Sequence, residues 1–305
     1  MTARALLAGA LVVGALASGC DRLAGPAPSS PHARYAEALR AAGLDTLMAG
    51  RLWLAAADSA LAQGDSLGLP DVAALAFTAG RPRAWSARFA VRQGERLQVR
   101  VVSALGDSAR AFVDLFAVGT GGADLVEGAV AQGDTLRLSY DADVDGTLLL
   151  RVQPELLGSG GVRVEIETAP SLEFPVAGAG PADIGSVWAD PRDGGARRHE
   201  GIDVFAPRGT PAVASAPGQV TRVQETPRGG RVVWLSPDGR AVSLYYAHLD
   251  TQTVSAGQRV GTGDTLGRVG NTGNAAGTPP HLHFGVYGRG GATDPSPFVV
   301  ARPGP

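Results

Sequence analysis

The sequence is short of several residue types, and each shortage excludes a class of protein. It has one cysteine, so no disulfide can form within the chain. It has no lysine, so it cannot be a lipoyl or biotin carrier, because such carriers attach their cofactor to a lysine side chain. All 27 basic residues are therefore arginines, set against 29 acidic residues, and the formal net charge is −2. No basic block is present, so we expect no nucleic-acid partner.

Histidine is also scarce, and four of the five histidines lie beyond residue 198. They occur in H-x-x-x-D (His199 to Asp203), Y-A-H-L (His248) and H-L-H-F (His281 and His283). Two imidazoles and one carboxylate would suit a catalytic zinc ion, whose fourth position stays open for water. A strand would point His281 and His283 to one face, and a spacing of four puts His199 and Asp203 on one side. Three histidines compete for two ligand positions, however, and spacing alone leaves the assignment open.

The N-terminal segment is typical of a bacterial lipoprotein signal. Residues 5–17 are apolar but shorter than the roughly 20 residues that a membrane-spanning helix needs. They lead into L-A-S-G-C, which resembles a lipobox and ends at the sole cysteine, Cys20. We therefore predict a signal peptide over residues 1–19 and a lipid anchor at Cys20, which would place the protein at the bacterial cell envelope and facing the periplasm. The alternative is an ordinary cleaved signal peptide beside an unrelated cysteine. The sequence does not show whether the lipid anchor would lie in the inner or the outer membrane.

The segment after Cys20 changes from a tether to helices. Residues 20–34 are rich in Ala, Pro and Ser, which is typical of a tether. Ser30 and Pro31 favour a helix start and Gly43 a helix end. Residues 35–68 are accordingly predicted to form a helical hairpin.

The remaining chain predicts a mostly β protein. Residues 71–169 alternate apolar and polar side chains between glycine-containing turns, which indicates an antiparallel β-sandwich. Asp114 within it is interpreted as a turn residue and not as a calcium ligand. Residues 170–181 have linker composition. Residues 182–305 are rich in glycine and predict a β-barrel or β-sheet domain that holds the four clustered histidines.

Four segments of this last domain carry a resemblance to a known family. They are H-E-G-I-D-V-F-A-P-R-G-T-P-A-V, L-Y-Y-A-H-L, A-G-Q-R-V-G-T-G-D-T-L-G-R-V-G-N-T-G-N and P-P-H-L-H-F-G-V-Y. In this order they resemble the lysostaphin/LytM-type zinc endopeptidases, and the match extends over about residues 184–300. The family's hairpins are similar to those of lipoyl-carrier folds, so the same hairpins are expected here.

The resemblance implies a role for each clustered histidine. It implies that His199, Asp203 and His283 bind zinc, and that His248 and His281 stay unligated. One of these two would take a proton from the attacking water, and the other would stabilise the water or the oxyanion. The implied activity is a zinc-dependent endopeptidase that cleaves the peptide cross-links of peptidoglycan.

The same residues also allow other functions. The chain could be a non-enzymatic module that activates a cell-wall amidase, although family members of that kind have lost ligands. It could also be a peptidase acting on other envelope proteins, and the β-sandwich could bind such partners. Glu200 is left outside the site, because it would point away from His199 on a strand. Tyr246 could border the groove or pack in the barrel. The sequence does not identify which type of cross-link is cleaved.

Overall fold

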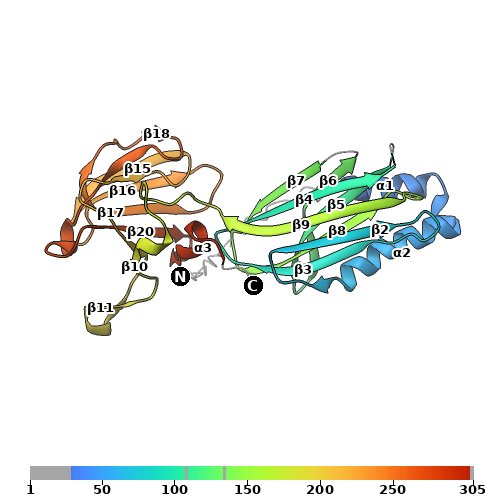
Figure 1. The fold of residues 1–305 in the computed structure, drawn as a ribbon, viewed down its shortest axis with the longest axis horizontal. Coiled ribbons are helices and arrows are strands. Elements are labelled where there is room, and N and C mark those ends of the chain that lie inside the picture. Colours follow the sequence, from blue (N-terminus) through green and yellow to red (C-terminus); the bar gives the residue numbers. More distant parts are fainter. Residues whose placement is uncertain (1–28, 107–108, 133–134, 303–305) are drawn as a thin grey trace, which may run out of the picture.

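The computed structural model describes residues 29–106, 109–132 and 135–302, so Cys20 and the predicted signal sequence lie outside the described residues. The protein is mostly β, as the alternating pattern predicted. Figure 1 shows two β bodies side by side along the longest axis, with the N-terminal helices at the end remote from the C-terminal body. No helix in the described ranges is long and apolar enough to cross a membrane.

The first body is a sandwich of two sheets with a shared apolar core. One sheet has the order β1-β3-β8-β5-β6 and the other β2-β9-β4-β7, with every pair antiparallel except β1 with β3. Inward side chains repeat every second residue, as in Leu97, Val99 and Val101, which are almost fully buried. The strands are β1 (Asp65–Ser66), β2 (Asp71–Phe77), β3 (Trp85–Val91), β4 (Glu95–Leu105), β5 (Arg110–Gly119), β6 (Gly122–Gln132), β7 (Thr135–Asp141), β8 (Gly146–Pro154) and β9 (Gly160–Pro170).

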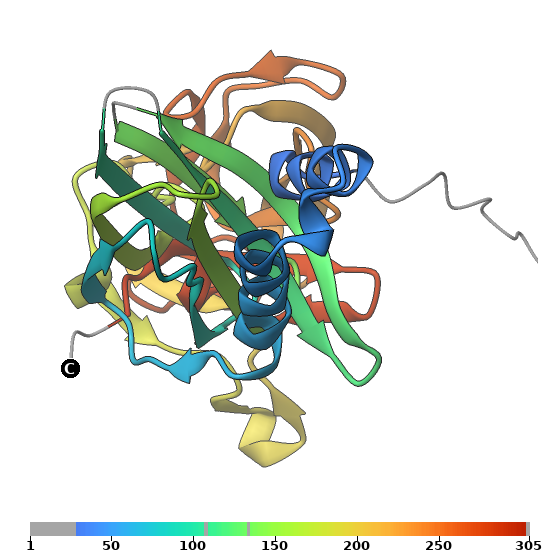
Figure 2. The same cartoon turned by 90° about the vertical axis from the view of Figure 1, so that its right-hand side faces the viewer.

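Two helices precede the sandwich. Helix α1 (Pro31–Ala41) begins where Ser30 Oγ accepts a hydrogen bond from the Ala33 amide at 3.1 Å. The chain turns after the helix at Gly43, whose φ of +71° suits a residue without a Cβ. A 3₁₀ turn (Leu44–Thr46) leads to α2 (Met48–Ala62). The helical segment thus begins at residue 31, inside the stretch that composition assigned to the tether. Figure 2 looks at this end of the molecule and shows both blue helices in front of the strands.

The helices cover the outer face of β5, so this strand is buried on both sides. Phe112 packs with Trp53 and His32, whose rings stack at 4.8 Å between centroids. Beside them, Asp114 is fully buried in mid-strand and accepts a 2.6 Å hydrogen bond from Arg151. The expectation of a turn aspartate at residue 114 was therefore wrong. The reason is that a covered strand can hold an outward carboxylate when a buried cation satisfies it.

The second body is a ten-stranded antiparallel sheet. Its main order is β10-β13-β20-β17-β16-β15-β18, and β14, β19 and β21 pair off this path. A two-stranded ribbon, β11–β12, stands apart from it, as Figure 1 shows for β11. The elements are β10 (Ile184–Ser186), β11 (Pro191–Arg192), β12 (Arg197–Arg198), β13 (Ile202–Phe205), β14 (Pro211–Val213), β15 (Gly218–Thr226), β16 (Gly230–Pro237), β17 (Ser243–Gln252), β18 (Arg259–Val260), β19 (Thr265–Val269), β20 (His281–Gly288), β21 (Gly291–Thr293), α3 (Ser296–Val299) and the 3₁₀ turns Pro181–Asp183, Asp193–Gly195 and Gly273–Ala275.

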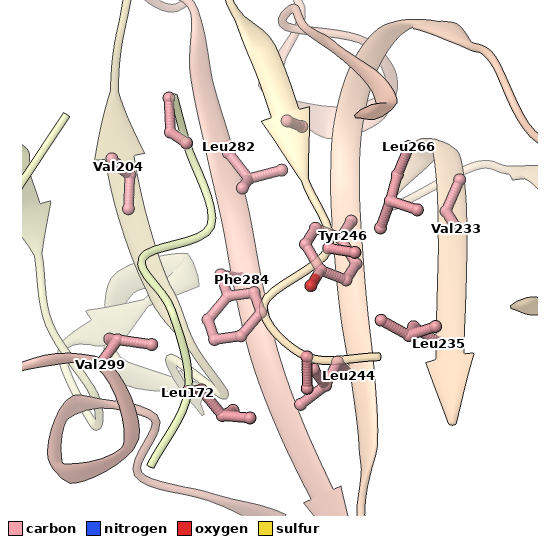
Figure 3. Close-up of a cluster of buried hydrophobic side chains, with 14 of the residues drawn as sticks. Leu172, Val204, Val233, Leu235, Leu244, Tyr246, Leu266, Leu282, Phe284 and Val299 are labelled. Carbon is pink, nitrogen blue, oxygen red and sulfur yellow. The ribbon is translucent and has the colours of Figure 1, made fainter. Parts of the chain in front are cut away.

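One face of this sheet forms the second apolar core. Figure 3 shows Leu282 and Phe284 of β20 beside Tyr246 and Leu244 of β17, all pointing into it. Leu282 and Phe284 are fully buried, so the intervening residues of β20 must face the other side of the sheet. The core therefore fixes which side chains reach the opposite face, where the histidines lie.

Residues 170–181, expected to be a linker, pack against the C-terminal core. Leu172 and Val176 are both buried in it, and the Leu172 amide donates to Phe298 O at 2.8 Å. Polar contacts also join the two bodies. Arg302 binds Glu95 at 2.6 Å, and Arg240 binds Asp141 at 2.6 Å. The sandwich and the sheet are thus tied directly to each other as well as through the chain.

Candidate metal centre

Three neighbouring strands bring the histidine segments together. In the pairing of β13 with β20, Asp203 lies opposite His283, and in the pairing of β17 with β20, Ala247 lies opposite the same histidine. Hydrophobic burial on the other face forces His281 and His283 to one side, as the alternation predicted. His199 reaches the same place from the loop between β12 and β13. Segments more than 80 residues apart in sequence thus converge.

His199, Asp203 and His283 present three ligand atoms to one point. His199 Nε2 lies 3.0 Å from Asp203 Oδ1 and 2.9 Å from His283 Nδ1. His283 Nδ1 lies 3.0 Å from Asp203 Oδ1, which closes a nearly equilateral triangle. These three residues form the one group of potential metal ligands of this kind in the described part of the chain.

The chemistry of these atoms fits a cation. His199 Nδ1 donates its proton to Val187 O at 2.8 Å, so the neutral ring turns the lone pair of Nε2 toward the other two ligand atoms. A carboxylate oxygen and imidazole lone pairs facing one another at about 3 Å repel unless a positive charge lies among them. A triangle of this size accepts an ion about 2.0 Å from each corner, the usual distance from zinc to nitrogen and oxygen.

Two further contacts hold the triangle in shape. Arg192 donates to the other carboxylate oxygen, Asp203 Oδ2, at 2.8 Å, and also to Ser186 Oγ at 2.6 Å. Burial opposes ionisation of Asp203, but its contacts with His199 and His283 outweigh this and hold the pKa of the carboxyl well below its usual range. Asp203 therefore keeps its negative charge, and Arg192 leaves Oδ1 to face the two imidazoles.

Gly201 makes room for the ring of His283. A Cβ at residue 201 would lie 2.5 Å from Phe284 O, 2.6 Å from His283 Cε1 and 2.8 Å from His283 Nε2. Atoms in real proteins do not approach so closely, so any side chain here would displace the ring or the strand. The glycine of the H-E-G-I-D segment is thus a steric requirement of the site.

His248 and His281 lie beside the triangle, and the backbone orients both rings. His248 Nδ1 donates to Thr272 O, and His281 Nδ1 donates to Pro279 O, each at 2.9 Å. In the neutral form of either ring, the proton on Nδ1 leaves Nε2 as the acceptor nitrogen. Burial, with the nearby His283 and His281, lowers the pKa of His248 to about 4, so that this ring is neutral at pH 7. The ring centroids of His248 and His281 are 5.1 Å apart.

His248 has an unusual backbone, and this changes which residues face the site. Its φ is +62°. The register between β16 and β17 also shifts nearby, between the pair that contains Arg231 and the pair that contains Val233. Alternation therefore breaks, and Tyr245 lines the site together with His248. Tyr246 is fully buried and donates to Ser215 Oγ at 3.0 Å. Tyr246 therefore packs in the core of the sheet and does not border the groove.

These residues line an open groove of about 580 Å³. Beyond the triangle its floor is aromatic, with Trp234, Tyr245 and Tyr287 at centroid distances of 4.5 Å to 6.0 Å. Glu200, which was expected to lie outside the site, lines the wall of the groove.

Sequence reasoning also missed Arg192, because its contact with Asp203 depends on the fold of the β11–β12 ribbon.

Residues 197–295, which contain the triangle and both further histidines, match the family model described as peptidase family M23. This region is a peptidase family M23 domain. The expectation of a lysostaphin/LytM-type peptidase domain is thereby confirmed at the level of the family.

Curated relatives are similar to part of this chain. An uncharacterized metalloprotease of Haemophilus influenzae is 34% identical over 153 residues, which are 50% of this chain and 30% of the relative. The peptidoglycan DD-endopeptidase ShyA of Vibrio cholerae is 37% identical over 92 residues, 30% of this chain and 21% of the relative. The chain therefore spans less than a third of the length of these two curated relatives.

A solved structure is also similar to part of this chain. It is the catalytic domain of the antimicrobial peptidase lysostaphin from Staphylococcus simulans, at 30% sequence identity and a TM-score of 0.35. The match covers 37% of this chain and 89% of that domain.

Proposed function

We propose that this protein is a zinc-dependent endopeptidase that cleaves peptide cross-links of peptidoglycan. The observation that carries the proposal is the triangle of His199, Asp203 and His283, flanked by two histidines whose Nδ1 atoms are held by backbone carbonyls. The match of residues 197–295 to peptidase family M23 supports peptide hydrolysis. The similarity to a protein named as a peptidoglycan DD-endopeptidase supports the substrate class.

The task of the triangle would be to hold the zinc ion. The chemistry supplied by a bound zinc ion is Lewis-acid activation of water and of the peptide carbonyl. His199, Asp203 and His283 would hold that ion, with Val187 O and Arg192 keeping two of them oriented.

His248 and His281 each offer an acceptor nitrogen to the groove. One removes a proton from the attacking water, and once protonated it can pass that proton to the departing amine. The other, in its protonated form, donates a hydrogen bond to the carbonyl oxygen as negative charge develops there. Burial keeps His248 neutral before reaction, which suits the role of a base. The fixed Nδ1 contacts reduce the reorganisation that either role needs.

A non-enzymatic role has less support than hydrolysis. A module that only activates an amidase has no need to keep three convergent ligands and two oriented histidines. In this chain all five residues are present, and their partners are in place. We therefore rank hydrolysis of peptidoglycan above the activation of another enzyme.

The decisive experiment is digestion of purified peptidoglycan sacculi by the zinc-loaded full chain, with mass analysis of the released muropeptides. We expect release of cross-link fragments that stops on chelation and returns with zinc, and no release by Asp203→Ala. Absence of any cleaved peptide bond in the presence of zinc would refute the proposal. A gain in the rate of a separate amidase, without cleavage by the chain itself, would favour the regulatory role.

We further propose that Cys20 anchors the enzyme to the membrane of the cell envelope. The support is the L-A-S-G-C segment and the position of the sole cysteine at the end of the apolar stretch. Cys20→Ala should move the protein out of the membrane fraction, or stop its maturation, and leave zinc content unchanged. Normal processing and persistent membrane association of the variant would count against the anchor.

A further inference from the structure

The groove contains three arginines, and two of them are already paired with carboxylates. Arg192 binds Asp203, and the Nε of Arg197 donates to Asp193 at 2.9 Å. Arg228 also lines the groove and is exposed. Within the described ranges of the chain, its guanidinium has no carboxylate within 4.0 Å. Arg228 is therefore the cation of this groove that is free to meet a ligand.

The backbone fixes Arg228 next to the catalytic histidines. It lies in the turn between β15 and β16, where its carbonyl accepts a hydrogen bond from the Asn274 amide at 3.0 Å. The next residue, Gly229, accepts one from the His248 amide at 2.8 Å. A Cβ on Gly229 would lie 2.1 Å from the Tyr245 hydroxyl, so the turn is in close contact with the aromatic floor. The start of the Arg228 side chain is thus held at the rim above this floor.

The opposite wall of the groove carries the opposite charge. In the order of the sheet, β20 and β17 separate β13, which follows Glu200, from the β15–β16 turn with Arg228. Both charges act on the hydroxyl of Tyr287 between them. Burial is the main cause that raises the pKa of Tyr287 to about 12, while Glu200 raises it further and Arg228 lowers it. A ligand lying on the floor therefore meets a positive rim on one side and a negative rim on the other.

We propose that Arg228 binds a free carboxylate of the substrate close to the scissile bond, and that the enzyme thereby favours carboxylate-bearing cross-links over neutral ones such as glycine bridges. The proposal rests on the proposed function. A guanidinium can hold a carboxylate through two parallel hydrogen bonds, and this selects for both charge and orientation. Glu200 repels the same carboxylate, so that it can bind in one orientation only. The aromatic rings beneath provide apolar contact for the stem of the residue that carries it.

The test compares two cross-linked muropeptide dimers that differ in one group. In one, the carboxyl of the diaminopimelate residue at the cross-link is free, and in the other the same carboxyl is amidated. We expect the zinc-loaded full chain to show about tenfold higher kcat/KM for the free carboxylate, mainly through KM. Arg228→Gln should cleave the two dimers within twofold of each other, and Arg228→Glu should reverse the preference.

Matched controls and a second readout keep the proposal separable from the proposed function. Arg222→Gln removes an exposed arginine of the same hairpin outside the groove and should keep the wild-type preference. Equal cleavage of both dimers by wild type, or an unchanged preference in Arg228→Gln, would overturn the proposal.

If zinc-loaded wild type cleaves neither dimer, the proposed function fails on its own, and titration calorimetry with the same dimers then decides the carboxylate proposal. We expect tighter binding of the free carboxylate by wild type and equal binding by Arg228→Gln. Equal affinities for wild type would overturn the proposal in that case too.

Discussion

Substitution of Gly201 by alanine tests the geometry of the metal centre without removing any of its polar groups. The new Cβ would lie 2.5 Å from Phe284 O and 2.6 Å from His283 Cε1. Phe284 belongs to the ladder between β13 and β20, where it pairs with Ile202, so its carbonyl cannot retreat without loss of strand pairing. The ring of His283 must move instead, by roughly 1 Å if it is to regain ordinary contact distance.

This displacement should appear as two separate effects. Crowding against the backbone oxygen should destabilise the metal-free protein by about 1–3 kcal/mol. Moving a ligand off its site should weaken zinc binding about 100-fold or more, because changes even to residues that only support a ligand cost 10–100-fold. A 100-fold weaker affinity removes about 2.7 kcal/mol of the stabilisation that saturating zinc provides.

Zinc affinity is measured by competition with a chromophoric chelator, and stability by thermal unfolding with and without zinc. The matched control is Gly288→Ala, on the same strand β20, where a Cβ has no heavy atom within 4 Å. We expect this control to bind zinc as wild type does. If Gly201→Ala bound zinc within threefold of the control, the proposed ligand role of His283, or the steric argument for Gly201, would be wrong.

Three further predictions follow from the same contacts. His248→Gly, which tolerates the positive φ at that position, and His281→Ala should retain zinc and lose two to four orders of magnitude in turnover, and zinc loss in either variant would contradict the assignment. Arg192→Gln should weaken zinc binding about 10–100-fold by freeing Asp203 Oδ2, and a chelator titration that shows unchanged affinity would exclude this positioning role. Glu95→Gln should cost about 1–3 kcal/mol at pH 7, because the buried carboxylate is held by two arginines. Burial opposes ionisation of Glu95, but these arginines lower its pKa from 4.5, so its contribution is present above pH 4.5 and disappears as the pH falls through the lower folded-state pKa. The melting temperatures of wild type and Glu95→Gln should therefore converge in acid, and a constant difference between them would refute the linkage.

The sequence predicted those parts of the protein that depend on local periodicity. Alternation over residues 71–169 indicated strands, and the structure has two antiparallel sheets there. The H-L-H-F segment predicted that His281 and His283 share one face, because side chains on a strand repeat every two residues. This relation is independent of what the strand packs against, so it could be read without tertiary information. The roles of these histidines at the metal centre remain predictions.

Local periodicity failed where the backbone departed from the regular strand. Tyr246 is two residues before His248, so regular alternation would place both side chains on one face, yet Tyr246 is buried and Tyr245 lines the groove. The positive φ of His248 is the cause, since it turns that side chain out of the alternating pattern. Sequence alone gives no signal for this conformation, because the residue is not a glycine.

The sequence by itself thus determined which residue types are available for chemistry and which of them share a strand face. Only the tertiary structure decided that His199, Asp203 and His283 meet within about 3 Å, because they come from a loop and two strands. It also decided that Arg192 is used within the site while Arg228 is left to face a ligand. The physical reason is that ligand convergence and charge pairing depend on distances between remote segments. Those distances are set by the packing of the sheet on its core, and residue spacing does not contain them.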